Sequence, residues 1–124
     1  MPPRRRTDPA DGRAALAAWR ADPSQVGPRR TAVRFTLEEL ADVAPGNAVE
    51  VRVPPDGAVQ AVEGPRHTRG TPPNVVETDP QTWLQLATGT LTWDDAISEG
   101  RIRASGERAD LGEWLPLQAA RTRS

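Results

Sequence analysis

The stretch AVEVRVPPDGAVQAVEG, residues 48–64, decides the fold because its hydrophobic period is that of a strand. In VEVRV, valine alternates with glutamate and arginine, which is typical of a strand with one solvated face. The PPDG that follows predicts a turn, in which Pro55 presets φ and Gly57 takes the position that needs positive φ. We therefore predict a β-hairpin over residues 48–63.

A first helix is expected well before the hairpin, in ADGRAALAAWRADP. Asp11 can serve as its N-cap, Leu16 and Trp19 are spaced for one apolar face, and Pro23 stands beyond its end. The SQVGPRR that follows is typical of a connector.

A capping box predicts a second, short helix in FTLEELADVAPG. Thr36 can be the N-cap with Glu39 three residues later, and Phe35 is placed as the hydrophobic staple. This helix should end near Pro45 and Gly46.

Strand and helix signals alternate after the hairpin. NVVET predicts a third strand, and Asp79 can cap a helix that starts at Pro80 and closes at Gly89. Thr92 and Gly100 bound a second such helix, in TWDDAISEG. RIRASG predicts a short amphipathic strand, and ADLGEWLPL a last, short apolar helix.

This order of elements predicts an α+β domain. We expect a mainly antiparallel sheet of about four to five strands, covered by helices on one face. A disordered basic leader is expected over residues 1–10, one domain over residues 11–117 and a polar, disordered tail over residues 118–124.

The composition excludes several kinds of chemistry. All 16 basic residues are arginine and there is no cysteine, which removes lysine Schiff bases, disulfides, thiolate nucleophiles and the common zinc sites. The net charge of −1 offers no broad positive face for nucleic acid. No apolar run approaches the length of about 18 residues that spans a bilayer. We therefore expect a cytoplasmic protein with no nucleic-acid partner, no stable membrane insertion and no cofactor.

The segment GPRHTRGTPPNVVETDP, residues 64–80, contains the one histidine of the chain. His67 could act as a general base, but the sequence offers no partner for it, so we predict neither a catalytic residue nor a metal ligand. Arg66 and Arg69, with the backbone N–H groups around Gly70, could bind a carboxylate or a phosphate. The alternative is a rigid loop whose arginines pair with neighbouring acids, and the prolines favour it.

The tryptophans pose a similar choice. Trp83, Trp93 and Trp114 could line an apolar cavity with their N–H groups at its rim. Core packing explains them more simply, since the chain has one phenylalanine and no tyrosine and tryptophan is its main large side chain.

From Val75 to Leu117 the sequence resembles the C-terminal half of the sterol carrier protein family. That half carries a strand, two helices that each end in glycine, a basic strand of the form G-R-I-R-x-S-G and an apolar segment. The matching positions here are Gly89, Gly100, Arg101, Ile102, Ser105 and Gly106. VRVPPDGAVQAVEGPRHTRGTPPNVVETDPQTW is similar to a stretch typical of a small actinobacterial branch of bacterial sterol carrier orthologues, which extends the resemblance to residues 30–117.

The resemblance implies a sterol-carrier-like fold with an apolar ligand site under the helices, and a fatty acid, acyl-CoA or sterol as ligand. Our leading hypothesis is a non-enzymatic carrier or binding protein for a small apolar ligand with an acidic head group. The residues expected to line its pocket are Trp83, Leu84, Leu86, Leu91, Trp93, Ile97, Leu111 and Trp114. Arg66, His67 and Arg69 would lie near the head group.

Two alternatives stay open. The chain could be a protein-interaction domain on the same fold without a ligand site, and its protein partner would then be unknown. It could also be an accessory domain of an isomerase or a hydrolase.

Overall fold

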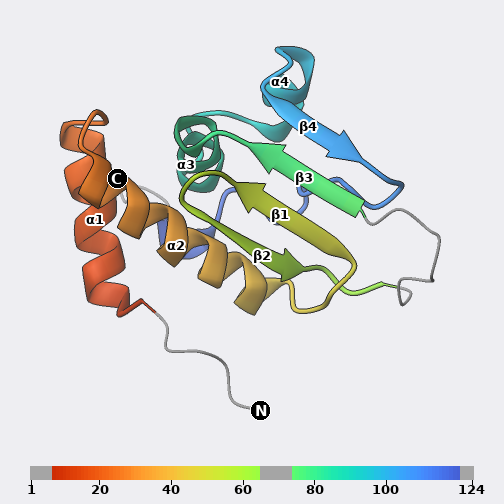
Figure 1. The fold of residues 1–124 in the computed structure, drawn as a ribbon, viewed down its shortest axis with the longest axis horizontal. Coiled ribbons are helices and arrows are strands. Elements are labelled where there is room, and N and C mark those ends of the chain that lie inside the picture. The colour runs from red at the N-terminus through yellow and green to blue at the C-terminus, as the bar shows by residue number, and fades with distance from the viewer. Residues whose placement is uncertain (1–6, 65–73, 121–124) are drawn as a thin grey trace.

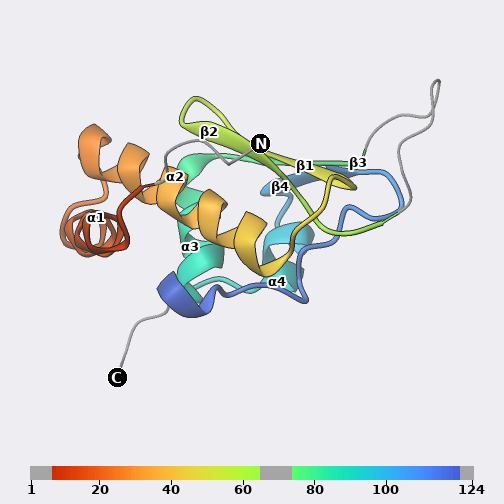
Figure 2. The ribbon, with the colours of Figure 1, turned by 90° about the horizontal axis from the view of Figure 1, so that it is seen from below.

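A four-stranded mixed sheet with helices against one face organises the chain (Figure 1). The computed structural model describes residues 7–64 and 74–120. The elements in chain order are α1 (Pro9–Ala21), α2 (Val26–Val43), β1 (Val49–Val53), β2 (Gly57–Ala61), β3 (Asn74–Thr78), α3 (Pro80–Thr88), α4 (Trp93–Ser98), β4 (Ile102–Ser105) and the 3₁₀ turn η1 (Gln118–Ala120). Figure 2 shows α2, α3 and α4 below the sheet, with α1 packed beside α2. Within the described residues, no helix is both long and apolar enough to cross a membrane.

The strand order is β2-β1-β3-β4. The predicted α+β class is confirmed. Two of the three strand pairs are antiparallel, but β1 and β3 run parallel. They are parallel because the hairpin strand β2 returns the chain to the end of the sheet where β1 starts. Ala61 and Asn74 both lie opposite Val49, so β3 begins beside the start of β1 and runs in the same direction.

The hairpin prediction is confirmed, but one detail of its turn is wrong. The turn closes with the Asp56 N–H donating to the Val53 carbonyl at 2.8 Å. Gly57 is then the first residue of β2, paired with Val53, and its φ is not positive. The turn is therefore complete one residue earlier than the PPDG motif indicates.

Helix α1 begins earlier than predicted. Asp8, not Asp11, is the N-cap, and its carboxylate accepts from the Ala10 N–H at 2.8 Å. Pro9 occupies the first helical position, where its fixed φ suits a helix and its missing N–H costs nothing. Pro9 and Ala10 therefore belong to the helix and not to the expected leader, whose residues 1–6 lie outside the described part of the chain.

Helix α2 is much longer than the predicted second helix. It starts at Val26, inside the expected connector, because a glycine and a proline are tolerated in a first helical turn. Thr36 therefore lies inside the helix and is not an N-cap, so the capping box is wrong. Its hydroxyl donates to the Ala32 carbonyl at 2.7 Å and accepts from the Trp83 N–H at 2.8 Å. A contact with α3 thus decides the role of this threonine.

The two helices after β3 follow their capping signals. Asp79 caps α3 by accepting from the Thr82 N–H at 2.8 Å, and Gly89 ends that helix in the left-handed conformation with φ 91°. Thr92 caps α4 in the same way, and Gly100 follows it with φ 71°. Both predictions are confirmed.

The last apolar segment, residues 109–117, forms turns where a short helix was predicted. The backbone N–H of Trp114 donates to the Leu111 carbonyl, and the backbone N–H of Leu117 donates to the Ala87 carbonyl of α3, each at 3.0 Å. Residues 118–120 then form η1 rather than part of a disordered tail, and Ala120 is only 2% exposed. The segment binds α3 instead of forming its own helix.

The end of α1 contacts the end of the described chain. The Arg20 guanidinium of α1 donates to the Ala120 carbonyl of η1 at 2.8 Å. The Trp19 N–H donates to the Gln81 side chain at 2.7 Å, which ties α1 to the start of α3. Helix α1 is therefore held to three separate parts of the fold, since its apolar stripe also packs on α2.

Gly46, in the turn between α2 and β1, is expected to be indispensable for stability. Its φ is 144°, and a Cβ there would overlap the carbonyl group of Val62. We expect Gly46→Ala to lower the free energy of unfolding by about 3 kcal/mol, through backbone strain and this overlap. Urea unfolding followed by circular dichroism measures the loss.

Gly27 provides the matched control for this substitution. It lies in the first turn of α2, and a Cβ there meets no atom within 4 Å. Gly27→Ala should leave stability unchanged or raise it by up to about 1 kcal/mol, because alanine favours helix. Equal losses for the two variants would show that the conformation of Gly46 is not the cause.

Candidate functional site

Four of the side chains expected to line a ligand site belong to the packed core instead. Trp83, Leu84, Leu86 and Leu111 are each no more than 1% exposed and lie within one hydrophobic cluster with the valines of β1. Side chains this well buried pack closely against other protein atoms. In the structure these four residues are therefore part of the core.

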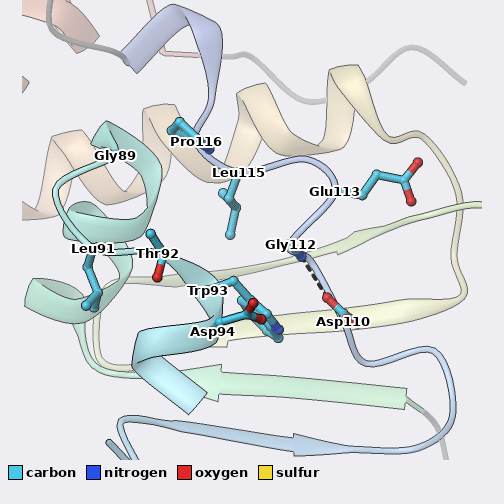
Figure 3. A pocket seen from close by; sticks show the side chains of 10 residues that line it. All are labelled: Gly89, Leu91, Thr92, Trp93, Asp94, Asp110, Gly112, Glu113, Leu115 and Pro116. Carbon is cyan, nitrogen blue, oxygen red and sulfur yellow. Dashed lines mark hydrogen bonds between the residues drawn. The ribbon is translucent and has the colours of Figure 1, made fainter. Parts of the chain in front are cut away.

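A pocket lies instead between the α3–α4 connection and residues 110–116 (Figure 3). Its volume is about 380 Å³. The residues that line it are Gly89, Leu91, Thr92, Trp93, Asp94, Asp110, Gly112, Glu113, Leu115 and Pro116. Of the eight side chains expected to line a ligand site, only Leu91 and Trp93 are among them.

The remaining two predicted residues lie elsewhere. Ile97 is 42% exposed, because the buried stripe of α4 consists of Trp93 and Ala96 and is narrower than predicted. Trp114 is partly buried and packs against the hydrophobic core. Arg66, His67 and Arg69, which were expected near a head group, lie outside the described residues.

Local helix geometry places the apolar wall of the pocket. Thr92 accepts from the Asp95 N–H at 3.1 Å, which starts α4 at Trp93 and leaves this tryptophan 8% exposed. Leu115 extends from the opposite segment toward α4 (Figure 3), and Pro116 lies against Gly89. The wall is thus built from two segments that the sequence separates by about twenty positions.

Gly112 brings a carboxylate and an indole edge to one point of the wall. A Cβ at this glycine would lie 3.2 Å from Asp110 Oδ1 and 3.4 Å from Trp93 Cδ1. The Gly112 N–H donates to Asp110 Oδ1 at 2.8 Å, which fixes the carboxylate (Figure 3). The five-membered ring of the Trp93 indole, which carries the N–H group, therefore lies beside the carboxylate of Asp110.

The polar lining carries one sign of charge. Asp94, Asp110 and Glu113 are exposed acids, and no arginine is among the described lining residues. Figure 3 shows the Glu113 side chain directed away from Trp93. The described residues contain no group of three or more His, Cys, Asp or Glu side chains arranged to hold a metal ion.

Sequence reasoning missed most of the polar lining. Asp110, Gly112 and Glu113 belong to ADLGEWLPL, where the apolar residues dominate the pattern and predict only packing. The available signal was the pairing of a small residue with an acid, Ala-Asp and Gly-Glu, inside that segment. This pairing indicates a pocket lining only once the segment is known to lie beside α4.

Comparison with known proteins identifies the family. The family model described as "Bacterial SCP ortholog" matches residues 27–117, from the first turn of α2 to the end of the segment that lines the pocket. Helix α1 precedes the matched region. None of the curated proteins matches the chain. Because the match covers most of the sequence and agrees with the resemblance of its motifs, the chain belongs to the bacterial sterol carrier protein-like family.

Proposed function

We propose that this protein is a non-enzymatic binding or carrier protein for a small, partly apolar ligand. The family supports a lipid-binding or carrier role. The observation that carries the proposal is the pocket of about 380 Å³ between Trp93 and Leu115. Ligand sites typically have a volume of about 300–1,000 Å³, and the volume of this pocket falls within that range, although its lining is as polar as it is apolar.

The pocket size limits the ligand. A volume of about 380 Å³ accommodates one chain or a small ring system, and the nucleotide of an acyl-CoA would lie outside it. The apolar body of the ligand would contact Leu91, the Trp93 ring and Leu115. Its polar end would meet the acids at the rim. In this proposal Trp83, Leu84 and Leu86 support the pocket from the core and do not contact the ligand.

The first experiment is native mass spectrometry of the freshly purified protein, followed by denaturing extraction. A stoichiometric bound mass would support the proposal and identify the ligand directly. The purified protein is then titrated with octan-1-ol, with the indole N–H signal of Trp93 followed by NMR. Trp93→Phe assigns this signal among the four tryptophan resonances.

Filling the pocket should weaken binding. Leu115→Phe adds volume where Leu115 faces α4, and we expect it to weaken octan-1-ol binding at least about tenfold because the ligand and the new ring compete for one space. Calorimetric titration measures the dissociation constant. Ile97→Phe is the matched control, since it adds the same ring to α4 at an exposed position outside the pocket.

The result that contradicts the proposal is equally plain. A bare protein mass, with no Trp93 shift on titration, would leave the fold without a ligand site in this pocket. The protein-interaction domain would then be the better interpretation.

A further inference from the structure

The acids of the pocket have acceptor capacity that the fold does not use. The ion pairs among the described residues join Arg29 and Arg30 to Asp56, Arg52 to Glu77, and Arg101 to Glu99. None of them includes Asp94, Asp110 or Glu113. Within residues 7–64 and 74–120, Asp110 accepts one hydrogen bond, from Gly112, through one oxygen only. An ionised carboxylate offers about four lone-pair positions, so acceptors remain available at the rim.

A second, independent feature is the N–H group of Trp93. Trp19 and Trp83 donate theirs to Gln81 and Thr36. The Trp93 side chain is more than nine-tenths buried and lines the pocket, yet its N–H has no hydrogen-bond partner in the described part of the chain. No fully buried side-chain nitrogen there lacks a partner, so this N–H is open to solvent. Because it is not used by the fold, this N–H is available to donate to a ligand in the pocket in place of water.

These two features belong to the lining of one pocket, where Asp110 Oδ1 and Cδ1 of the Trp93 ring both lie beside Gly112. A hydroxyl group can donate to the carboxylate and accept from the indole at once. An ammonium group can donate to the carboxylates and gains from their charge. A carboxylate could accept from Trp93 only, and it would be repelled by the acids around it.

We propose that this pocket selects ligands whose polar end donates hydrogen bonds, as a hydroxyl or an ammonium group, and discriminates against carboxylates. The inference rests on the proposed function, since it concerns the same pocket. It reverses the charge expected from the sequence, where arginines in the 64–73 segment were assigned to an acidic head group. The ligand class becomes an apolar alcohol or amine rather than a fatty acid.

Three probes with one apolar body test the inference. Octan-1-ol, octylammonium and octanoate are titrated into the full chain at neutral pH, with calorimetry for the dissociation constants and the Trp93 indole signal for the location. We expect octanoate to bind at least about tenfold more weakly than either of the others, because its carboxylate is repelled by the three acids that line the pocket. Comparison of the dissociation constants of octan-1-ol and octylammonium shows which donor group the pocket prefers.

Charge-neutral variants test whether the pocket acids cause the discrimination against octanoate. Asp94→Asn with Asp110→Asn keeps the shape of both side chains and should reduce the difference between octanoate and octan-1-ol to less than about threefold. The control is Asp95→Asn with Glu107→Gln, which removes two exposed acids that do not line the pocket. This control should retain the full discrimination. Trp93→Phe should weaken octan-1-ol more than octylammonium, because only the hydroxyl accepts from the indole.

The outcomes separate the two proposals. If octanoate binds as tightly as octan-1-ol and shifts Trp93 equally, the pocket binds ligand but the selectivity for donors is wrong. If none of the three probes shifts Trp93, the proposed function fails in this pocket. If the control variant loses as much discrimination as the pocket variant, net charge and not the pocket acids is responsible, which also overturns the inference.

Discussion

Truncation of Trp83 to alanine is expected to lower the free energy of unfolding by about 4 kcal/mol. The side chain is 0% exposed, and its N–H donates to Thr36 Oγ1 at 2.8 Å, so the change removes the largest fully buried side chain and one buried hydrogen bond. Domains of this size are typically stable by about 5–15 kcal/mol, so the loss is a large fraction of the total stability. Urea unfolding with circular dichroism measures the difference.

A double-mutant cycle separates packing from hydrogen bonding at this site. Thr36→Val leaves the indole N–H buried without an acceptor and should cost about 1–3 kcal/mol. In the Trp83→Phe background the same change should cost clearly less, because there is no N–H to satisfy. Additive losses in the double variant would show that the bond contributes nothing.

Removal of the Asp56 carboxylate is the second large effect, with an expected loss of about 3 kcal/mol for Asp56→Ala. The side chain is fully buried at the hairpin turn, and its two oxygens accept from Arg29 Nε at 2.7 Å and Nη2 at 3.0 Å. The variant breaks this bidentate link and leaves Arg29, whose side chain is 19% exposed, without its carboxylate. Thermal unfolding and urea titration should agree on the loss.

The pH dependence of this pair has a defined direction. The hydrogen bonds that the Arg29 guanidinium donates to the Asp56 carboxylate raise the pKa of Arg29. A raised pKa in the folded protein stabilises it at all pH values below the unfolded pKa, and the contribution is lost only as strongly alkaline pH is reached. The effect of Asp56→Ala through Arg29 should therefore be constant between pH 6 and pH 9.

An exposed ion pair supplies the comparison. Arg52 Nε of β1 lies 3.7 Å from Glu77 Oε1 of β3, and the two side chains are 52% and 33% exposed. Glu77→Gln should cost less than about 1 kcal/mol, because solvent screens such pairs. If Asp56→Ala costs no more than Glu77→Gln, burial of the Asp56 carboxylate has no consequence for stability.

The parts of the fold that the sequence predicted are those with local signals. Asp79 and Gly89 bound α3 through contacts within a few residues, and alternation in β1 reflects its own two faces. Thr36 shows where such reasoning fails, because its partner Trp83 lies 47 positions away. A local capping motif and a helix interior look alike until that partner is known.

The candidate site was harder to predict for the same reason. Leu91, in the α3–α4 connection, and Trp93, the first residue of α4, could be predicted because both are apolar and lie beside clear capping signals. Asp110 and Gly112 could not, since only their position beside α4 makes them lining residues. Trp83 was assigned to the site because apolar side chains on a pocket wall and in a core have the same periodicity.

The bond between Arg20 and Ala120 joins residues 100 positions apart. At the usual rate of synthesis, about 5–20 s pass between the appearance of two such residues. Helices α1 and α2 are both complete by residue 43, and we expect them to associate during that interval because their contacts are local. The sheet cannot assemble until β3 and β4 have followed. We therefore expect the helical pair to form first and the bond between η1 and α1 to form last.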